Sequence, residues 1–105
     1  MYIAMNRFKV QKGSEPEFEK RWINRDRHLN EVPGYLEFHL LKGAEEEDHT
    51  LYASHTVWES YDAFVAWTKS DAFRAAHAQA GQNKVLYIGG PKFEGFETIL
   101  TETRK

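Results

Sequence analysis

The chain has 105 residues, of which 41% are hydrophobic and 29% charged, so it has enough apolar side chains for one packed core and no room for a second. Fourteen Lys and Arg against 16 Asp and Glu give a formal net charge of -2, which argues against nucleic acid or an anionic membrane surface as a partner. The sequence contains no cysteine, and this excludes disulfides, thiol chemistry and cysteine-based metal sites.

No apolar stretch approaches the roughly 20 residues that a membrane-spanning helix needs. The N-terminus begins with strand-like sequence instead of a charged segment followed by a hydrophobic one, so we expect a protein that is not exported and works in the cytoplasm. A chain of this length buries only about two thirds of its extended surface. A second copy covering an apolar sheet face would stabilise it, and we therefore expect a homodimer.

The first predicted element is a strand over residues 2–10, whose alternation places one set of side chains on a common inward face. This set is Tyr2, Ala4, Asn6, Phe8 and Val10.

A helix is predicted to follow, because Ser14 and Glu17 have the spacing of a capping box and Pro16 falls in the first turn. The helix must end before Pro33-Gly34. One face of this helix should carry four side chains spaced four, three and four residues apart. They are Phe18, Trp22, Arg25 and Leu29, and we call this face the stripe.

Residues 35–42 and 50–58 are rich in strand-forming side chains and flank an acidic turn over residues 43–49, so they predict a hairpin. Ser60 then caps a short helix that carries Phe64 and Trp67. Ser70 and Asp71 look like the cap of a second short helix, which we expect to run through residue 80.

Four glycine and proline residues within residues 81–92 indicate a long loop, with a brief extended piece around residues 85–88, before a last strand over residues 93–101. The order strand, helix, strand, strand, helix pair, strand predicts an α+β fold of the ferredoxin-like, split βαβ type. Helices would cover one face of an antiparallel sheet. The other face would pair with a second copy, so that two sheets close into a homodimeric α+β barrel.

Four residues are unusual for packing alone. Asn6 lies in mid-strand among apolar neighbours, where its amide needs partners; taken alone, a hydrogen bond to nearby backbone is the more ordinary explanation. His77 has small alanine neighbours that would let a flat ligand approach a neutral imidazole, although an exposed histidine near a helix end is as reasonable. Trp67 could be core or cofactor contact. Arg25 is the one charge on an apolar stripe, and could reach carboxylates or simply extend into water.

The other histidines indicate no metal site. His39 and His55 sit on the two hairpin strands with a parity that lets them approach each other, but no carboxylate stands at a recognisable zinc-ligand spacing. His28 and His49 are expected at the surface. The acidic run over residues 45–48 lacks the glycine and spaced oxygen ligands of a calcium loop.

Five segments carry a family resemblance that spans nearly the whole chain. The sequence resembles the IsdG-type haem-degrading monooxygenases of the antibiotic biosynthesis monooxygenase superfamily of dimeric α+β barrels. The matching segments are Met5-Asn6-Arg7-Phe8, Pro33-Gly34-Tyr35, Thr56-Val57-Trp58-Glu59-Ser60, Ala63 to Ser70, and Phe73-Arg74-Ala75-Ala76-His77.

The resemblance implies one monooxygenase domain over residues 1–105 with haem bound through His77 as the axial ligand of the iron. It implies that Trp67 packs against the porphyrin and buckles it, and that the Asn6 amide donates a hydrogen bond to oxygen on the distal side. Arg25 matches a position that in some relatives lies by the haem propionates. Trp22, which stands where relatives commonly have Phe, and Phe73 would border the haem.

The implied reaction uses haem as both substrate and cofactor, together with dioxygen and an external electron donor, either a reductase or a small-molecule reductant. It would cleave the porphyrin at a meso carbon to an open tetrapyrrole and release iron for nutrition. Two alternatives stay open. One is a haem-binding carrier or sensor without turnover, and the other is a cofactor-independent monooxygenase acting on a phenolic or quinol substrate.

Overall fold

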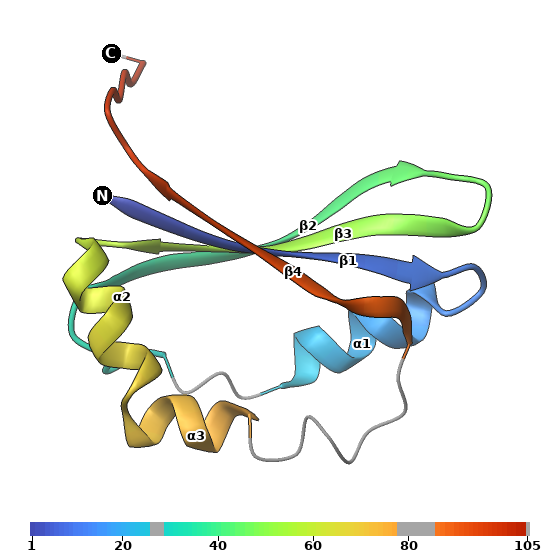
Figure 1. Cartoon of the computed structure of the whole chain (residues 1–105), viewed down its shortest axis with the longest axis horizontal. Coiled ribbons are helices and arrows are strands. Elements are labelled where there is room, and N and C mark those ends of the chain that lie inside the picture. Colours follow the sequence, from blue (N-terminus) through green and yellow to red (C-terminus); the bar gives the residue numbers. More distant parts are fainter. Residues whose placement is uncertain (26–28, 78–85, 105) are drawn as a thin grey trace.

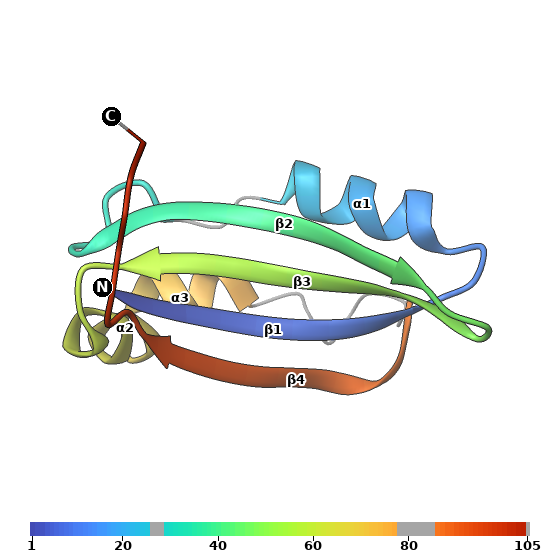
Figure 2. The ribbon, with the colours of Figure 1, turned by 90° about the horizontal axis from the view of Figure 1, so that it is seen from above.

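The computed structural model describes residues 1–25, 29–77 and 86–104, with the backbone alone at residues 76 and 77. It contains one four-stranded antiparallel sheet in the order β2-β3-β1-β4 (Figure 2), which confirms the ferredoxin-like α+β prediction. The elements are β1 (Tyr2–Gln11), α1 (Glu15–Asn24), β2 (Tyr35–Glu45), β3 (His49–Trp58), α2 (Tyr61–Thr68), α3 (Asp71–His77) and β4 (Tyr87–Glu97).

The three helices lie on one face of the sheet, with α1 beneath one end and α2 and α3 beneath the other (Figure 1). The opposite face carries no helix of the described chain. After β4 the chain leaves the sheet on that uncovered side (Figure 1). None of the helices in the described ranges is both long and apolar enough to cross a membrane.

The alternation predicted for the first strand is confirmed, since Tyr2, Ala4, Phe8 and Val10 are buried toward the helices and Asn6 is half-buried among them. Two separate groups of buried side chains form the core. The α1-side cluster consists of Phe8, Val10, Phe18, Tyr52 and Leu86. The α2-side cluster consists of Tyr2, Ala4, Leu29 and Trp58.

The first helix starts after Ser14 with Pro16 in its first turn, as predicted, but the predicted capping box and stripe are wrong. The Ser14 side chain makes no capping hydrogen bond; instead the carboxylate of Glu15 accepts from the backbone N–H of Gly13 at 2.8 Å. The helix ends at Asn24, and Arg25 has an extended backbone. Leu29 packs in the α2-side cluster, far along the sheet from Phe18, so one helical stripe cannot hold both. Residues 26–28, including His28, lie outside the described residues.

The predicted ends of the strands also need correction. β2 continues to Glu45, so only residues 46–48 remain as the turn. β4 begins at Tyr87 instead of residue 93, because residues 89–91 form a bulge opposite β1: Lys92 pairs with Arg7 while Ile88 pairs with Lys9. Residues 98–101 are not strand. The rest of the predicted loop, residues 81–85, and the predicted extension of α3 to residue 80 fall outside the described residues.

Candidate functional site

Asn6 lies at the centre of the helix-covered face. Its register partner on β3 is Ser54 and its partner on β4 is Phe93. Ser54 is buried, so an amide and a hydroxyl stand side by side between the α1-side and α2-side clusters. Sequence reasoning missed Ser54, although the alternation of residues 50–58 places it on the same face as Trp58.

On the α1 side, the site is bordered by Trp22. Its ring stacks on Phe38 of β2 with centroids 5.9 Å apart and planes 15° apart, and it packs edge-on against Phe8 at 5.7 Å. The guanidinium carbon of Arg25 lies 4.5 Å from the centre of the same indole, a cation–π distance. The two residues that sequence analysis singled out here therefore lie together, and Phe38 joins them unpredicted.

On the α2 side, Trp67 is the centre of an aromatic group. Its ring lies 5.2 Å from Trp58 and 4.8 Å from Phe73, the latter edge-on. Phe64 packs against Trp67 at 6.2 Å and stacks on Phe93 at 5.7 Å. Because Phe93 is the register partner of Asn6, a continuous run of rings leads from the strand beside Asn6 to Trp67.

Serine caps hold the two short helices that carry these residues, as the sequence predicts. The Ser60 hydroxyl accepts from the backbone N–H of Ala63 at 3.1 Å, and the Ser70 hydroxyl accepts from that of Phe73 at 3.1 Å. His77 is the last residue of α3. Its side chain lies outside the described residues, so its predicted role stays a prediction.

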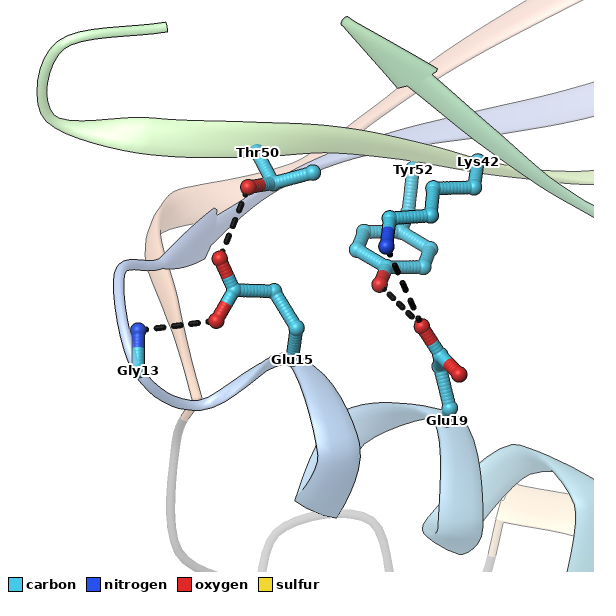
Figure 3. A network of polar contacts seen from close by, with 6 residues as sticks. All are labelled: Gly13, Glu15, Glu19, Lys42, Thr50 and Tyr52. Atoms are coloured by element: carbon cyan, nitrogen blue, oxygen red, sulfur yellow. Dashed lines mark hydrogen bonds and ion pairs between the residues drawn. The ribbon is translucent and has the colours of Figure 1, made fainter. Parts of the chain in front are cut away.

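Carboxylates hold α1 against the sheet (Figure 3). Glu15 accepts a hydrogen bond from the hydroxyl of Thr50 at 2.8 Å, and Glu19 accepts one from Tyr52. The Nζ of Lys42 lies 3.8 Å from the same Glu19 carboxylate. Burial, and then the Glu19 contact, raises the pKa of Tyr52, so the phenol stays a donor. These contacts fix the helix from which Trp22 extends.

The chemistry of these side chains suits a flat, apolar ligand. Indole and phenyl rings flank one amide and one hydroxyl, and Arg25 supplies a cation at the α1 border. Within the described ranges, no group of three or more His, Asp or Glu side chains could hold a metal ion. These side chains are of the types that line sites for flat ring systems, with the Asn6 amide and the Ser54 hydroxyl as hydrogen-bond donors.

Known proteins with the same fold match nearly the whole chain. The chain is 36% identical over 98 residues, 93% of its length and 89% of the relative's, to a heme oxygenase of Mycobacterium tuberculosis described as mycobilin-producing. The heme-degrader MhuD from the same organism, solved with two hemes in its active site, shares 31% identity with a TM-score of 0.74, covering 98% of this chain and 100% of that one.

A more distant structure shares the fold alone. SnoaB from Streptomyces nogalater, a cofactor-independent oxygenase, is 22% identical with a TM-score of 0.66, covering 95% of this chain and 94% of that one. The sequence profile of the antibiotic biosynthesis monooxygenase family matches residues 1–79. With most of its length matched by that profile and by a relative of this identity, the chain belongs to the antibiotic biosynthesis monooxygenase family.

Proposed function

We propose that this protein is a haem-degrading monooxygenase that takes haem as its substrate and opens the porphyrin at a meso carbon. The observation that carries the proposal is the 36% identity, over 93% of the chain, to a heme oxygenase. The position of Asn6 between two aromatic clusters supports it. Dioxygen and an external electron donor, a reductase or a small-molecule reductant, complete the reaction, and the products are an open tetrapyrrole and iron.

The side chains around Asn6 fit haem chemically. Haem is a flat apolar ring with two carboxylates, and the site offers the indoles of Trp22 and Trp67 as walls together with the ring of Phe73. Arg25, held over Trp22, offers a guanidinium that matches carboxylate geometry. These contacts would orient the ring on the helix-covered face.

In this proposal His77 would hold the haem iron, Trp67 would pack against the porphyrin, and Asn6 would donate a hydrogen bond within the site. When bound, haem supplies both the iron that activates dioxygen and the carbon that is oxidised. The Asn6 amide, fixed on a central strand, stabilises negative charge that develops beside it. One such preorganised donor is worth about 2.7–4 kcal/mol.

A hemin titration tests the proposal. Hemin is added anaerobically, then ascorbate and air, and the products are identified by mass spectrometry. We expect one haem per subunit, loss of the Soret band after reduction in air, and an open tetrapyrrole. A Soret band that persists would identify a haem carrier or sensor, and protein that does not titrate with hemin would instead indicate a cofactor-independent oxygenase.

Variants assign the roles. His77→Ala should lose tight hemin binding, whereas Asn6→Ala should bind hemin and turn it over slowly. Asn30→Ala, at an exposed asparagine, is the matched control and should behave as the unmodified protein. Equal turnover by the Asn6 variant would refute the donor role. Trp67→Phe should flatten the bound porphyrin, seen by resonance Raman spectroscopy, and slow its cleavage.

The proposal includes a homodimer, formed through the sheet face that the helices leave uncovered. We call this the open face; strand register assigns it the odd-numbered residues of β1 and β3 and their partners. Its apolar side chains come from all four strands. The half-buried or exposed ones are Ile3, Met5, Leu41, Leu51, Ile88 and Phe96, and the buried ones are Ala53 and Val57.

The segment after β4 supports a second copy as the partner of the open face. It runs out on the same side of the sheet (Figure 1) and carries Ile99 and Leu100, which are 94% and 74% exposed. Two exposed aliphatic side chains in this segment suit contact with a neighbouring subunit, because burying them stabilises association.

Analytical ultracentrifugation tests the dimer. Leu100→Asp should weaken association, while Ile23→Asp, at a residue of α1 that is 71% exposed, is the control and should leave it unchanged. A monomer at micromolar concentration in the unmodified protein would overturn the dimer and leave the haem chemistry to its own test. A cytoplasmic location, where cellular reductants could supply the electrons, is part of the same proposal.

A further inference from the structure

We infer that the pair of His39 and His55 makes the open face a pH-sensitive interface between two copies of this chain, with the dimer favoured when the His55 imidazole is neutral. The inference rests on the homodimer proposed above and adds a control over it.

The two histidines stand side by side on the open face. They are direct register partners on β2 and β3, and their ring centroids are 5.6 Å apart. The approach expected from their strand parity is therefore confirmed. Met5 of β1 is the register partner of His55 on its other side.

His55 is in the more apolar position of the two. Its Nδ1 is buried and meets no hydrogen-bond partner within the described chain. His39 is more exposed, and its Nε2 lies 3.3 Å from a carboxylate oxygen of Glu37 on the same strand. A proton on His39 thus has a compensating charge at hand, whereas His55 has Met5 and a second imidazole as its cross-strand neighbours.

The charged side chains of the open face supply no carboxylate partner for a proton on His55 in addition to one on His39. Register places three cationic side chains and two carboxylates there, and Asp48 in the turn adds a third carboxylate near Lys9 and His49. The formal charges therefore balance, and protonation of both imidazoles adds two positive charges to the face. Arg7 and Glu94 already pair with each other, and His49, at the far end of β3, lies 2.6 Å from the carboxylate of Asp48. The cations and carboxylates are Arg7 and Lys9 of β1, Glu37 of β2, and Lys92 and Glu94 of β4.

A second copy would bring an equally charged and equally apolar sheet against this pair. Taking a charged imidazole out of water costs free energy unless it is paired, so the dimer selects the neutral form of His55. Histidine ordinarily titrates near pH 6.5. Below that value the dimer dissociation constant should rise by about tenfold per pH unit for each histidine that must stay neutral.

Sedimentation equilibrium of the full chain between about pH 8 and about pH 5.5, at fixed ionic strength, tests the inference. The dissociation constant should rise at least tenfold across this range, with circular dichroism showing the fold unchanged. In the His55→Leu variant, the dimer dissociation constant should stay the same over this pH range. His49→Gln, which alters a histidine that already has a carboxylate partner, is the matched control and should keep the pH dependence.

The outcomes separate the two proposals. A dimer whose dissociation constant does not change with pH overturns the role of the histidine pair and leaves the dimer standing, whereas a monomer at every pH overturns the dimer itself. If His55→Leu fails to fold, His39→Gln at the exposed position replaces it, and it should weaken the pH dependence because the positive neighbour of His55 is gone. Unchanged pH dependence in His39→Gln would overturn the inference.

Discussion

Both ends of the helix-covered face pack on the sheet through buried side chains, and the α1 end adds carboxylate contacts to this packing. At the α1 end, the carboxylates of Glu15 and Glu19 reach Thr50 and Tyr52 on β3 (Figure 3). At the α2 end, aromatic rings surround the fully buried Trp58. The proposed haem contacts are divided between these ends, so what disturbs one wall of the site should leave the other largely intact.

The largest expected effect on the free energy of unfolding comes from a substitution at the α2 end. Trp58→Ala removes a side chain with no exposed surface and leaves a cavity, so the free energy of unfolding should fall by about 3–5 kcal/mol. Trp58→Phe is the control. It keeps a ring, and the lost indole N–H has no hydrogen-bond partner among the described residues, so its cost should be clearly smaller. Urea denaturation measures both, and equal losses would contradict the packing argument.

Alanine substitutions at two glycines test how much space for a side chain is available at each end of the helix-covered face. Gly34 (φ +85°) leads into β2 and Gly13 (φ +90°) precedes α1, so both have the left-handed backbone that an alanine resists. A Cβ at Gly34 would lie 2.4 Å from the Cβ of Ala63 on α2, whereas one at Gly13 meets nothing within 4 Å.

Gly34→Ala should therefore cost about 1–3 kcal/mol more in unfolding free energy than Gly13→Ala, which carries only the backbone cost. Thermal and urea denaturation of the two variants give the difference. Equal destabilisation would show that the α2 end yields to added volume as readily as the α1 end.

Tyr52→Phe tests the polar attachment of α1 by deleting one hydroxyl. The buried ring stays in place, but the hydrogen bond to the Glu19 carboxylate is lost, which should cost about 1.5–3 kcal/mol of unfolding free energy. Tyr61→Phe, at an exposed residue of α2, is the control and should cost little. If the two variants are equally stable, α1 is held by apolar packing as α2 is.

Most of the fold was predictable because burial in a sheet leaves a period of two in the sequence. Tyr2, Ala4, Phe8 and Val10 share one buried face as their spacing indicates. The helical spacing wrongly predicted that Arg25 and Leu29 continue the first helix. Periodicity does not reveal which of two core clusters a side chain joins. The Gly-Gly-Pro run at residues 89–91 reads as a loop, yet a bulge accommodates it within β4.

The site was less predictable than the fold. Sequence analysis placed Trp22 and Arg25 together, although on a helical stripe, whereas Arg25 in fact reaches the indole from an extended backbone. Phe38 and Phe93 come from other strands, and their contacts depend on register and on the β4 bulge. The assignment of roles to Asn6, Trp67 and His77 came from the family resemblance, and it stays a proposal.

The smallest expected effect is the response of the α1 end to acid. Hydrogen bonds from its own backbone N–H and from the Thr50 hydroxyl hold the pKa of Glu15 below its usual value of 4.5. A carboxyl whose pKa is lower in the folded state stabilises the fold above its unfolded pKa, and that contribution is lost as the pH falls through the lower, folded value.

Amide protons of α1 should therefore lose hydrogen-exchange protection before those of α2 as the pH falls below 4.5, measured residue by residue by NMR. Glu15→Gln should remove this difference between the helices, because no carboxyl titrates at that position. Glu17→Gln, at an exposed residue in the same turn, should preserve it. Simultaneous loss of protection in both helices would mean that acid unfolds the sheet as a whole, and the carboxylate contacts would then not act as a separate attachment for α1.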